Sequence, residues 1–174
     1  MNNDTLKIPK KLQQLELYVY PDGKVIGSIY LHLQSSRHTG EEKPEEMVNQ
    51  PEPFLVVRCK EPDSFRIYNK KFIIWIKYHN NEQAQESTAL MRLGPDRHML
   101  DLSAEMAGFV RLNCQLYLVD RSKLSGVIEE FLPPGHQRLF DFVNNNASAF
   151  VKLYLESGEI CLVNKAYIVR LSSD

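Results

Sequence analysis

The residues that could carry out chemistry are scattered through the sequence rather than gathered in motifs. The five histidines stand far apart, without the i, i+4 spacing that places two zinc ligands on one face of a helix. Glu129 and Glu130 are paired carboxylates, but neighbouring residues of a strand point to opposite faces and cannot act on one substrate atom. The sequence also contains no GxGxxG, GxxxxGK[ST] or GxSxG motif. We therefore predict no catalytic residue, no metal site and no cofactor, and we expect a protein that is not an enzyme.

Two arginines and an Asp-Ser pair form a candidate ligand site. Arg92 and Arg97 precede Asp120 and Ser122, and guanidinium groups bind phosphates with two parallel hydrogen bonds. The combination resembles the motifs of PilZ domains, an RxxxR segment followed by [DN]xSxxG, and this resemblance implies a sensor of a cyclic dinucleotide such as c-di-GMP. Each segment has one residue more than the PilZ pattern. Because side-chain direction alternates along a strand, the competing interpretation is a hairpin turn flanked by surface arginines.

Three further basic residues are candidate contacts. Lys70 and Lys165 each follow an asparagine, Asn69 and Asn164, and each precedes an apolar run. The asparagines are typical of a turn before the last strand, whereas the lysines could contact an anion or a partner. Arg138 could belong to a polar network that fixes a short helix. The complete set of candidate ligand or partner contacts is Lys70, Lys165, Arg92, Arg97, Asp120, Ser122 and Arg138.

The elements that position these residues are mainly strands. Residues 15–20 alternate in polarity and end at Pro21-Asp22-Gly23, which is typical of a tight turn, and residues 25–33 provide the partner strand. Residues 54–60 and 65–78 are also strand-like, with a break near Asn69. Between these strands, residues 35–53 form a long polar loop with a helical turn at 45–48. Residues 99–110 favour an amphipathic helix, although the stretch from Phe109 could equally open a strand.

An internal repeat is the most informative feature of the sequence. A shift of 99 residues aligns Leu17-Tyr18 with Leu116-Tyr117, and it also aligns Gly27 with Gly126. A shift of 95 aligns Glu46-Met47-Val48-Asn49 with Asp141-Phe142-Val143-Asn144 and Asn69-Lys70 with Asn164-Lys165. A small insertion or deletion in a loop accounts for the two shifts. The domain organisation that follows is a first β-barrel repeat at 13–79, a partly helical connection at 80–110 and a second β-barrel repeat at 111–173.

The second repeat resembles Sm-like domains. Its residues 114–128 are similar to the first Sm motif, a strand, a turn and a strand with Gly126, and residues 158–169 are similar to the second motif. Residues 133–144 also look like an element of bacterial small-barrel domains of uncharacterised function. The resemblance implies a mainly β fold of two tandem small Sm-like β-barrel repeats with short helical turns. Sm-like proteins line an RNA site with an Arg-Gly or similar pair, and Asn-Lys stands at that place here.

Composition limits the partners. The chain has 174 residues with 21 Lys and Arg against 22 Asp and Glu, so it lacks the positive charge of a general nucleic-acid binder. No apolar run is long enough for a membrane span, and we expect a cytoplasmic protein without membrane insertion. Cys59, Cys114 and Cys161 lie in separate apolar runs, which predicts three reduced, half-buried thiols that are largely inaccessible in the native protein.

Three hypotheses about function follow. The favoured one is a non-catalytic scaffold or regulatory binding module, made of two fused small barrels, that contacts a protein partner or forms a homo-oligomer. The second is a PilZ-like nucleotide sensor. The third is an Sm-like RNA binder, which the balanced charge disfavours.

Overall fold

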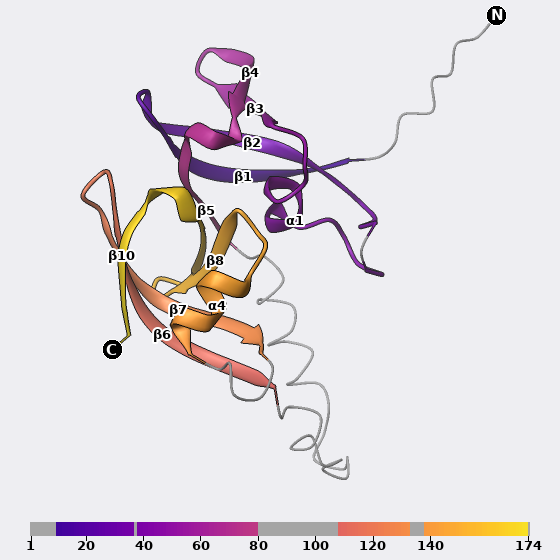
Figure 1. The fold of residues 1–174 in the computed structure, drawn as a ribbon. Coiled ribbons are helices and arrows are strands. Elements are labelled where there is room, and N and C mark those ends of the chain that lie inside the picture. Colours follow the sequence, from indigo (N-terminus) through magenta and orange to yellow (C-terminus); the bar gives the residue numbers. More distant parts are fainter. Residues whose placement is uncertain (1–9, 37, 80–107, 133–137, 174) are drawn as a thin grey trace, which may run out of the picture.

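The computed structural model describes residues 10–36, 38–79, 108–132 and 138–173 (Figure 1). The described part is mainly β, as the sequence predicts. Its ten strands form one antiparallel sheet in the order β10-β6-β7-β8-β9-β5-β1-β2-β3-β4.

The first half of the sheet comes from residues before position 80. Its elements are β1 (Lys10–Val19), β2 (Gly23–His32), α1 (Pro44–Val48), β3 (Phe54–Lys60), β4 (Asp63–Asn69), the 3-10 turn η1 (Lys70–Phe72) and β5 (Ile73–His79). The second half contains β6 (Phe109–Leu118), β7 (Lys123–Phe131), α4 (Leu139–Asn145), β8 (Phe150–Leu155), β9 (Glu159–Asn164), η2 (Lys165–Tyr167) and β10 (Ile168–Ser173).

Several local predictions are confirmed. Strands β1 and β2 form a hairpin around the predicted turn, where Gly23 has φ of 84°, a conformation that favours glycine. The predicted break near Asn69 is the turn η1, and the predicted helical turn at 45–48 is α1. Of the helix predicted over 99–110, residues 99–107 lie outside the described residues, and Phe109 and Val110 belong to β6 instead.

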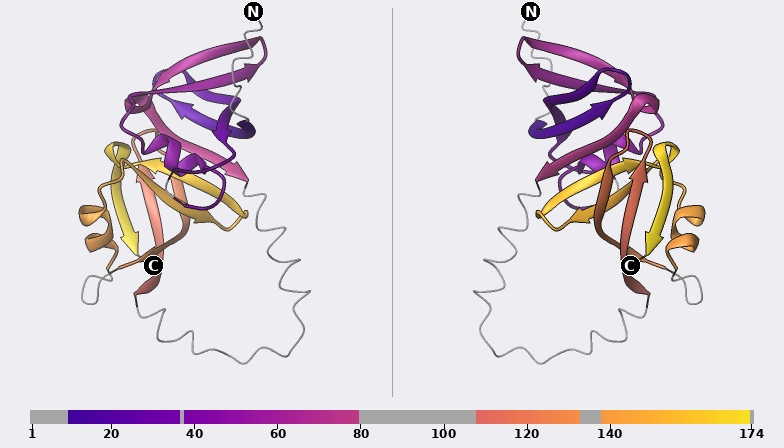
Figure 2. Two further views of the ribbon diagram at one scale, coloured as in Figure 1. Left: turned by 90° about the vertical axis from the view of Figure 1, so that its right-hand side faces the viewer. Right: turned by 90° about the vertical axis from the view of Figure 1, so that its left-hand side faces the viewer.

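The mainly β class is confirmed, whereas two closed barrels are not, because the described strands of the two predicted repeats belong to one sheet. The ten strands make one continuous sheet that is not closed, because β5 of the first half pairs with β9 of the second. Figure 2 shows the two halves in contact along this line, with the indigo-to-magenta strands of the first half against the orange-to-yellow strands of the second. Pairing between halves depends on residues far apart in the sequence, which local patterns do not report.

The two halves have the same internal arrangement. The first has the order β5-β1-β2-β3-β4 and the second β10-β6-β7-β8-β9. In each half the last strand pairs with the first through a shifted register, at Val19 opposite Ile73 and at Leu118 opposite Ile168. The strand pairings of the first half coincide with those of the second when its residue numbers are increased by a fixed shift. The shift is 99 for β1 and β2, 96 for β3, and 95 for α1, β4 and β5. We call residues related by these shifts matched positions.

Gly27 and Gly126 occupy matched positions where the second strand meets the third. A Cβ at Gly27 would lie 2.5 Å from Cγ1 of Val57, and one at Gly126 would lie 2.3 Å from the backbone oxygen of Tyr154. No side chain fits at such distances, so glycine lets the two strands approach.

The core consists of two apolar clusters, one centred on each half. The first contains Leu17, Ile29 and Leu55, and the second contains Leu116, Ile128 and Leu153. The three cysteines are free and buried, as predicted, and burial raises the pKa of Cys161 to about 12. No helix among the described residues is long and apolar enough to cross a membrane.

Candidate assembly interface

The junction between the halves is a backbone ladder between β5 and β9. Trp75 lies opposite Val163, Ile76 opposite Leu162, and the ladder continues to His79 opposite Glu159. This ladder makes β5 and β9 inner strands of the sheet, with a neighbouring strand on both edges of each.

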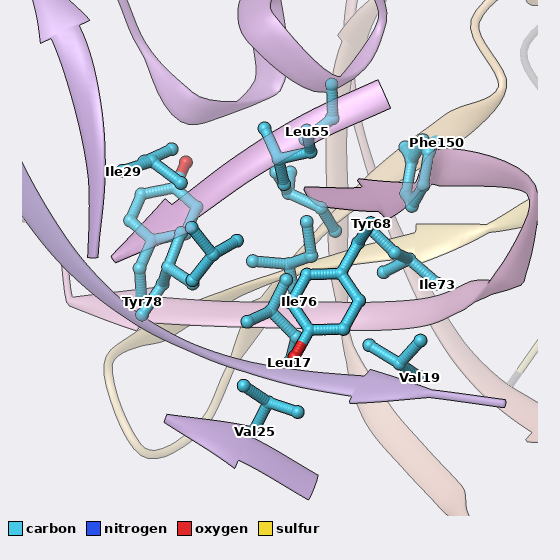
Figure 3. Packing of buried hydrophobic residues seen from close by; sticks show 14 of the residues in the cluster. Leu17, Val19, Val25, Ile29, Leu55, Tyr68, Ile73, Ile76, Tyr78 and Phe150 are labelled. Atoms are coloured by element: carbon cyan, nitrogen blue, oxygen red, sulfur yellow. The ribbon is translucent and has the colours of Figure 1, made fainter. Parts of the chain in front are cut away.

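One face of β9 is covered by the first half. Ile160 and Leu162, together with Phe150 of β8, belong to the apolar cluster of the first half rather than to that of the second. Figure 3 shows Phe150 among the side chains of this cluster, which also include Ile73 and Tyr68. The second half therefore contributes side chains to the core of the first.

The exchange also runs in the other direction. Ile74 and Trp75 of β5 belong to the cluster of the second half, where Cys161 and Val163 of β9 also lie. Each half thus completes the core of the other, which makes the junction resemble a domain core rather than a loose contact between domains.

Two asparagines fix the junction with side-chain amides. The Nδ2 group of buried Asn164 donates to the backbone oxygens of Ile73 at 2.9 Å and Lys70 at 3.3 Å. Asn49, which follows α1, accepts from the backbone N–H of Phe150 at 2.9 Å and donates to its oxygen at 3.4 Å. These bonds reach backbone groups of the opposite half from side chains at both ends of the contact, and so define the register of the two halves.

An ion pair lies at the edge of the junction. Glu45 of α1 accepts from Nζ of Lys152 of β8 at 2.8 Å and from the hydroxyl of Tyr78 of β5 at 2.7 Å. Burial on its own raises the pKa of Glu45, but the Lys152 ammonium and these hydrogen bonds outweigh burial and hold the pKa below its usual value. Burial likewise lowers the pKa of Lys152, and the Glu45 carboxylate outweighs it and raises the pKa.

The Asp-Ser pair of the PilZ-like motif is engaged in local contacts. Oδ1 of Asp120 accepts from the backbone N–H of Ser122 at 3.0 Å and from its hydroxyl at 2.6 Å. Oδ2 of Asp120 accepts from the indole N–H of Trp75 at 3.3 Å, which is another contact between the halves. Arg92 and Arg97 lie outside the described residues, so the structure does not place them beside this pair.

The two lysine candidates bind helix ends at matched positions. Nζ of Lys70 donates to the backbone oxygens of Met47, in the last turn of α1, and of Gln50, after the helix. Nζ of Lys165 donates to the backbone oxygen of Asn146 after α4. Burial lowers the pKa of both lysines. Their ammonium groups therefore hold the short helices against the turns η1 and η2.

The asparagines before these lysines shape the turns, as one of the two interpretations predicts. Asn69 accepts from the backbone N–H of Lys71, and Asn164 accepts from that of Ala166.

Arg138 is exposed at the N-terminus of α4, and its side chain lines a shallow groove on the second half. Within the described ranges, no three His, Cys, Asp or Glu side chains gather to form a metal site.

Strand β4 is a free edge of the sheet. Apolar residues near this edge are exposed, although the residues at matched positions on β8 and β9 are buried in the junction. Ile67 of β4 is 68% exposed, whereas its match Leu162 of β9 is 0% exposed. Phe65 and Phe54 are exposed in the same way, although their matches are buried. The matched pairs are Phe65 with Ile160, Phe54 with Phe150, and Ile67 with Leu162.

The opposite edge, at β10, shows the complementary surface. Val169 is 65% exposed, whereas its match Ile74 is 1% exposed in the junction. Ser173 of the same strand lines a groove on the second half, together with Arg111, Leu112, Asn113, Arg138, Leu139 and Phe140. Of the residues at matched positions, Gln13, Lys43, Pro44, Glu45 and Tyr78 line the cleft that Lys152 and Ile160 of the second half complete.

Sequence reasoning missed this interface, although it left a signal. Residues 160–163 (Ile-Cys-Leu-Val) and 73–76 (Ile-Ile-Trp-Ile) are unbroken apolar runs, and both are buried along their whole length. Residues 65–68 (Phe-Arg-Ile-Tyr), which match the first run, alternate with a charge. An unbroken apolar strand indicates cover on both faces, so the runs identify the inner strands of a junction.

Comparison with known protein families, with curated proteins and with solved structures gives no significant match for this chain.

Proposed function

We propose that this protein is a non-catalytic scaffold made of two copies of one small barrel-like unit, and that it assembles head to tail with further copies of itself. The edge β4 of one copy lies beside β10 of the next and repeats the β9–β5 junction within the chain. The supporting observation is that the free edges expose Ile67 and Val169, whose matches are fully buried in that junction.

The resemblance to Sm-like domains is part of this proposal. In keeping with it, each half starts with a hairpin whose second strand carries a glycine against the third strand. Two units joined in one chain avoid the entropy of bringing their first interface together, and they leave one unmatched edge of each kind.

Exposed strand edges with large apolar side chains pair readily with other strands. The β4 edge has two charged residues, Asp63 and Arg66, and Asp63 is paired with Arg58 of β3. The exposed Phe65 and Ile67 lie on either side of Arg66. An antiparallel register copied from the internal junction places Ile67 opposite Leu171 and Phe65 opposite Ser173 of the next copy. Contacts of this head-to-tail kind build closed rings or open filaments.

The mass of the full chain in solution tests the proposal. Sedimentation over a concentration series should give species that are multiples of 20.2 kDa. Ile67→Lys should weaken association by at least about tenfold, because the ammonium would have to lose its water inside the contact.

Ile26→Lys is the matched control for this experiment. Ile26 is as exposed as the edge residues, but its match Ser125 is also exposed, so that position does not belong to the junction. The Ile26 variant should assemble like the wild type. A wild-type chain that stays at 20.2 kDa at every concentration overturns the proposal.

A further inference from the structure

The contact between copies differs in polarity from the contact within the chain at one matched site. Inside the chain, Glu45 of α1 meets Lys152 of β8, and Tyr78 of β5 supports the carboxylate. At the free edges the matched residues are Phe140 of α4 and Val56 of β3, and Ser173 takes the position of Tyr78. Both members of the ion pair are thus replaced together by apolar residues.

The sizes of these residues also compensate for one another. Inside the chain the aromatic ring comes from Tyr78 on the strand and the smaller side chain, Glu45, comes from the helix. At the free edge the ring comes from Phe140 on the helix, and the strand supplies the small Ser173. Each site therefore has one aromatic ring, supplied by the strand inside the chain and by the helix at the free edge, and close packing of an interface requires such compensation of volume.

Phe140 is exposed in the single chain. It is 76% exposed on α4 and lines the groove of the second half. The matched cleft of the first half, at Glu45, receives Lys152 and Ile160. Val56 is also exposed, on the strand next to the free β4 edge. Phe140 therefore lies at the β10 edge and Val56 at the β4 edge, which are the two edges that meet in a head-to-tail contact.

We propose that Phe140 of one copy packs on Val56 of the next, and that this apolar pair, in place of Glu45–Lys152, determines which edge enters which groove. The inference rests on the proposed head-to-tail assembly. Lys152 and Ile160 already fill the α1 groove in each chain, and a β4 edge that displaced them would leave Glu45 opposite Val56, a buried carboxylate without its cation. A junction of that kind is disfavoured, so the two grooves select their own edges.

Replacing the two apolar side chains with charged ones tests the pair in the full chain. Phe140→Glu alone and Val56→Lys alone should each weaken association about 100-fold, since each buries an unpaired charge in the contact. The double variant should recover most of the association, because it recreates the ion pair found inside the chain. Phe131→Glu is the control for an added charge, since Phe131 is exposed on β7 and lies outside both grooves.

Sedimentation of these variants separates the two proposals. Wild-type chains that do not associate overturn the head-to-tail assembly and the Phe140–Val56 contact with it. A second outcome is that wild-type chains associate and the Ile67→Lys variant does not. In that case, a Phe140→Glu or Val56→Lys variant that associates like the wild type overturns the Phe140–Val56 pair alone. A double variant that is as dissociated as the single ones overturns it as well.

Discussion

The side-chain amide of Asn164 donates to the backbone oxygen of Ile73 across the junction, at 2.9 Å, and links two residues that are 91 positions apart. Its matched residue Asn69 makes the same local turn contact, but it stands at the free β4 edge. Two asparagines with one local role therefore differ only in whether a second half lies beside them.

This difference gives a paired prediction. Asn164→Ala should lower the free energy of unfolding by about 2 kcal/mol, because the buried backbone oxygens of Ile73 and Lys70 lose a donor. Asn69→Ala should cost about 1 kcal/mol or less, since it loses only the turn contact. Urea denaturation of both variants measures the difference. Equal losses would show that the cross-junction bonds contribute nothing.

Alanine at the two matched glycines should destabilise the fold strongly. Gly126→Ala places a methyl group 2.3 Å from a backbone oxygen, and Gly27→Ala places one 2.5 Å from Val57. Both should cost more than about 2 kcal/mol of unfolding free energy, because the crossing strands would have to separate. Gly40→Ala is the control: its new methyl group would meet only the exposed side chain of His38. Thermal melts that rank all three variants alike would contradict this account.

The Glu45–Lys152 pair should give the junction a defined pH dependence. The carboxyl pKa is lowered in the folded protein, so its stabilisation is complete above the unfolded value of about 4.5 and is lost as pH falls through the folded pKa. The ammonium pKa is raised, so its stabilisation is complete below about 10.5 and is lost as pH rises through the folded pKa.

Glu45→Gln tests this pH dependence. Both groups are partly exposed, so the variant should lose only about 1–2 kcal/mol of unfolding free energy at pH 7. The deficit should shrink well below pH 4, where the wild-type carboxylate is also protonated. A deficit that stays constant from pH 7 to pH 3 would mean that charge is not its cause.

The three cysteines should resist thiol reagents in the native protein. All are buried, and a pKa of about 12 leaves Cys161 almost entirely in its unreactive thiol form at pH 8. Labelling in buffer should therefore be slow and should follow global opening, whereas labelling in urea should be fast for all three. Rapid modification of Cys161 without denaturant would show that the junction opens on its own.

The sequence by itself determined the local elements of this protein. The strands are predicted by alternating polarity, by the turn at Pro21-Asp22-Gly23 and by the apolar run after Asn69. Each of these signals depends only on neighbouring residues. The matched glycines and the Asn-Lys pairs were also visible, since a shift of the sequence on itself aligns them.

Only the tertiary structure decided how the halves combine. The ladder between β5 and β9 and the contact of Glu45 with Lys152 join residues that are 80 to 107 positions apart, and no local pattern specifies a partner at such a distance. The structure also decided what the candidate residues do, because the bonds of Lys70, Lys165 and Asp120 depend on which backbone groups the fold brings within reach. The same pairing decides which apolar residues are buried: β9 is covered by the other half, and the matched strand β4 is left at an edge.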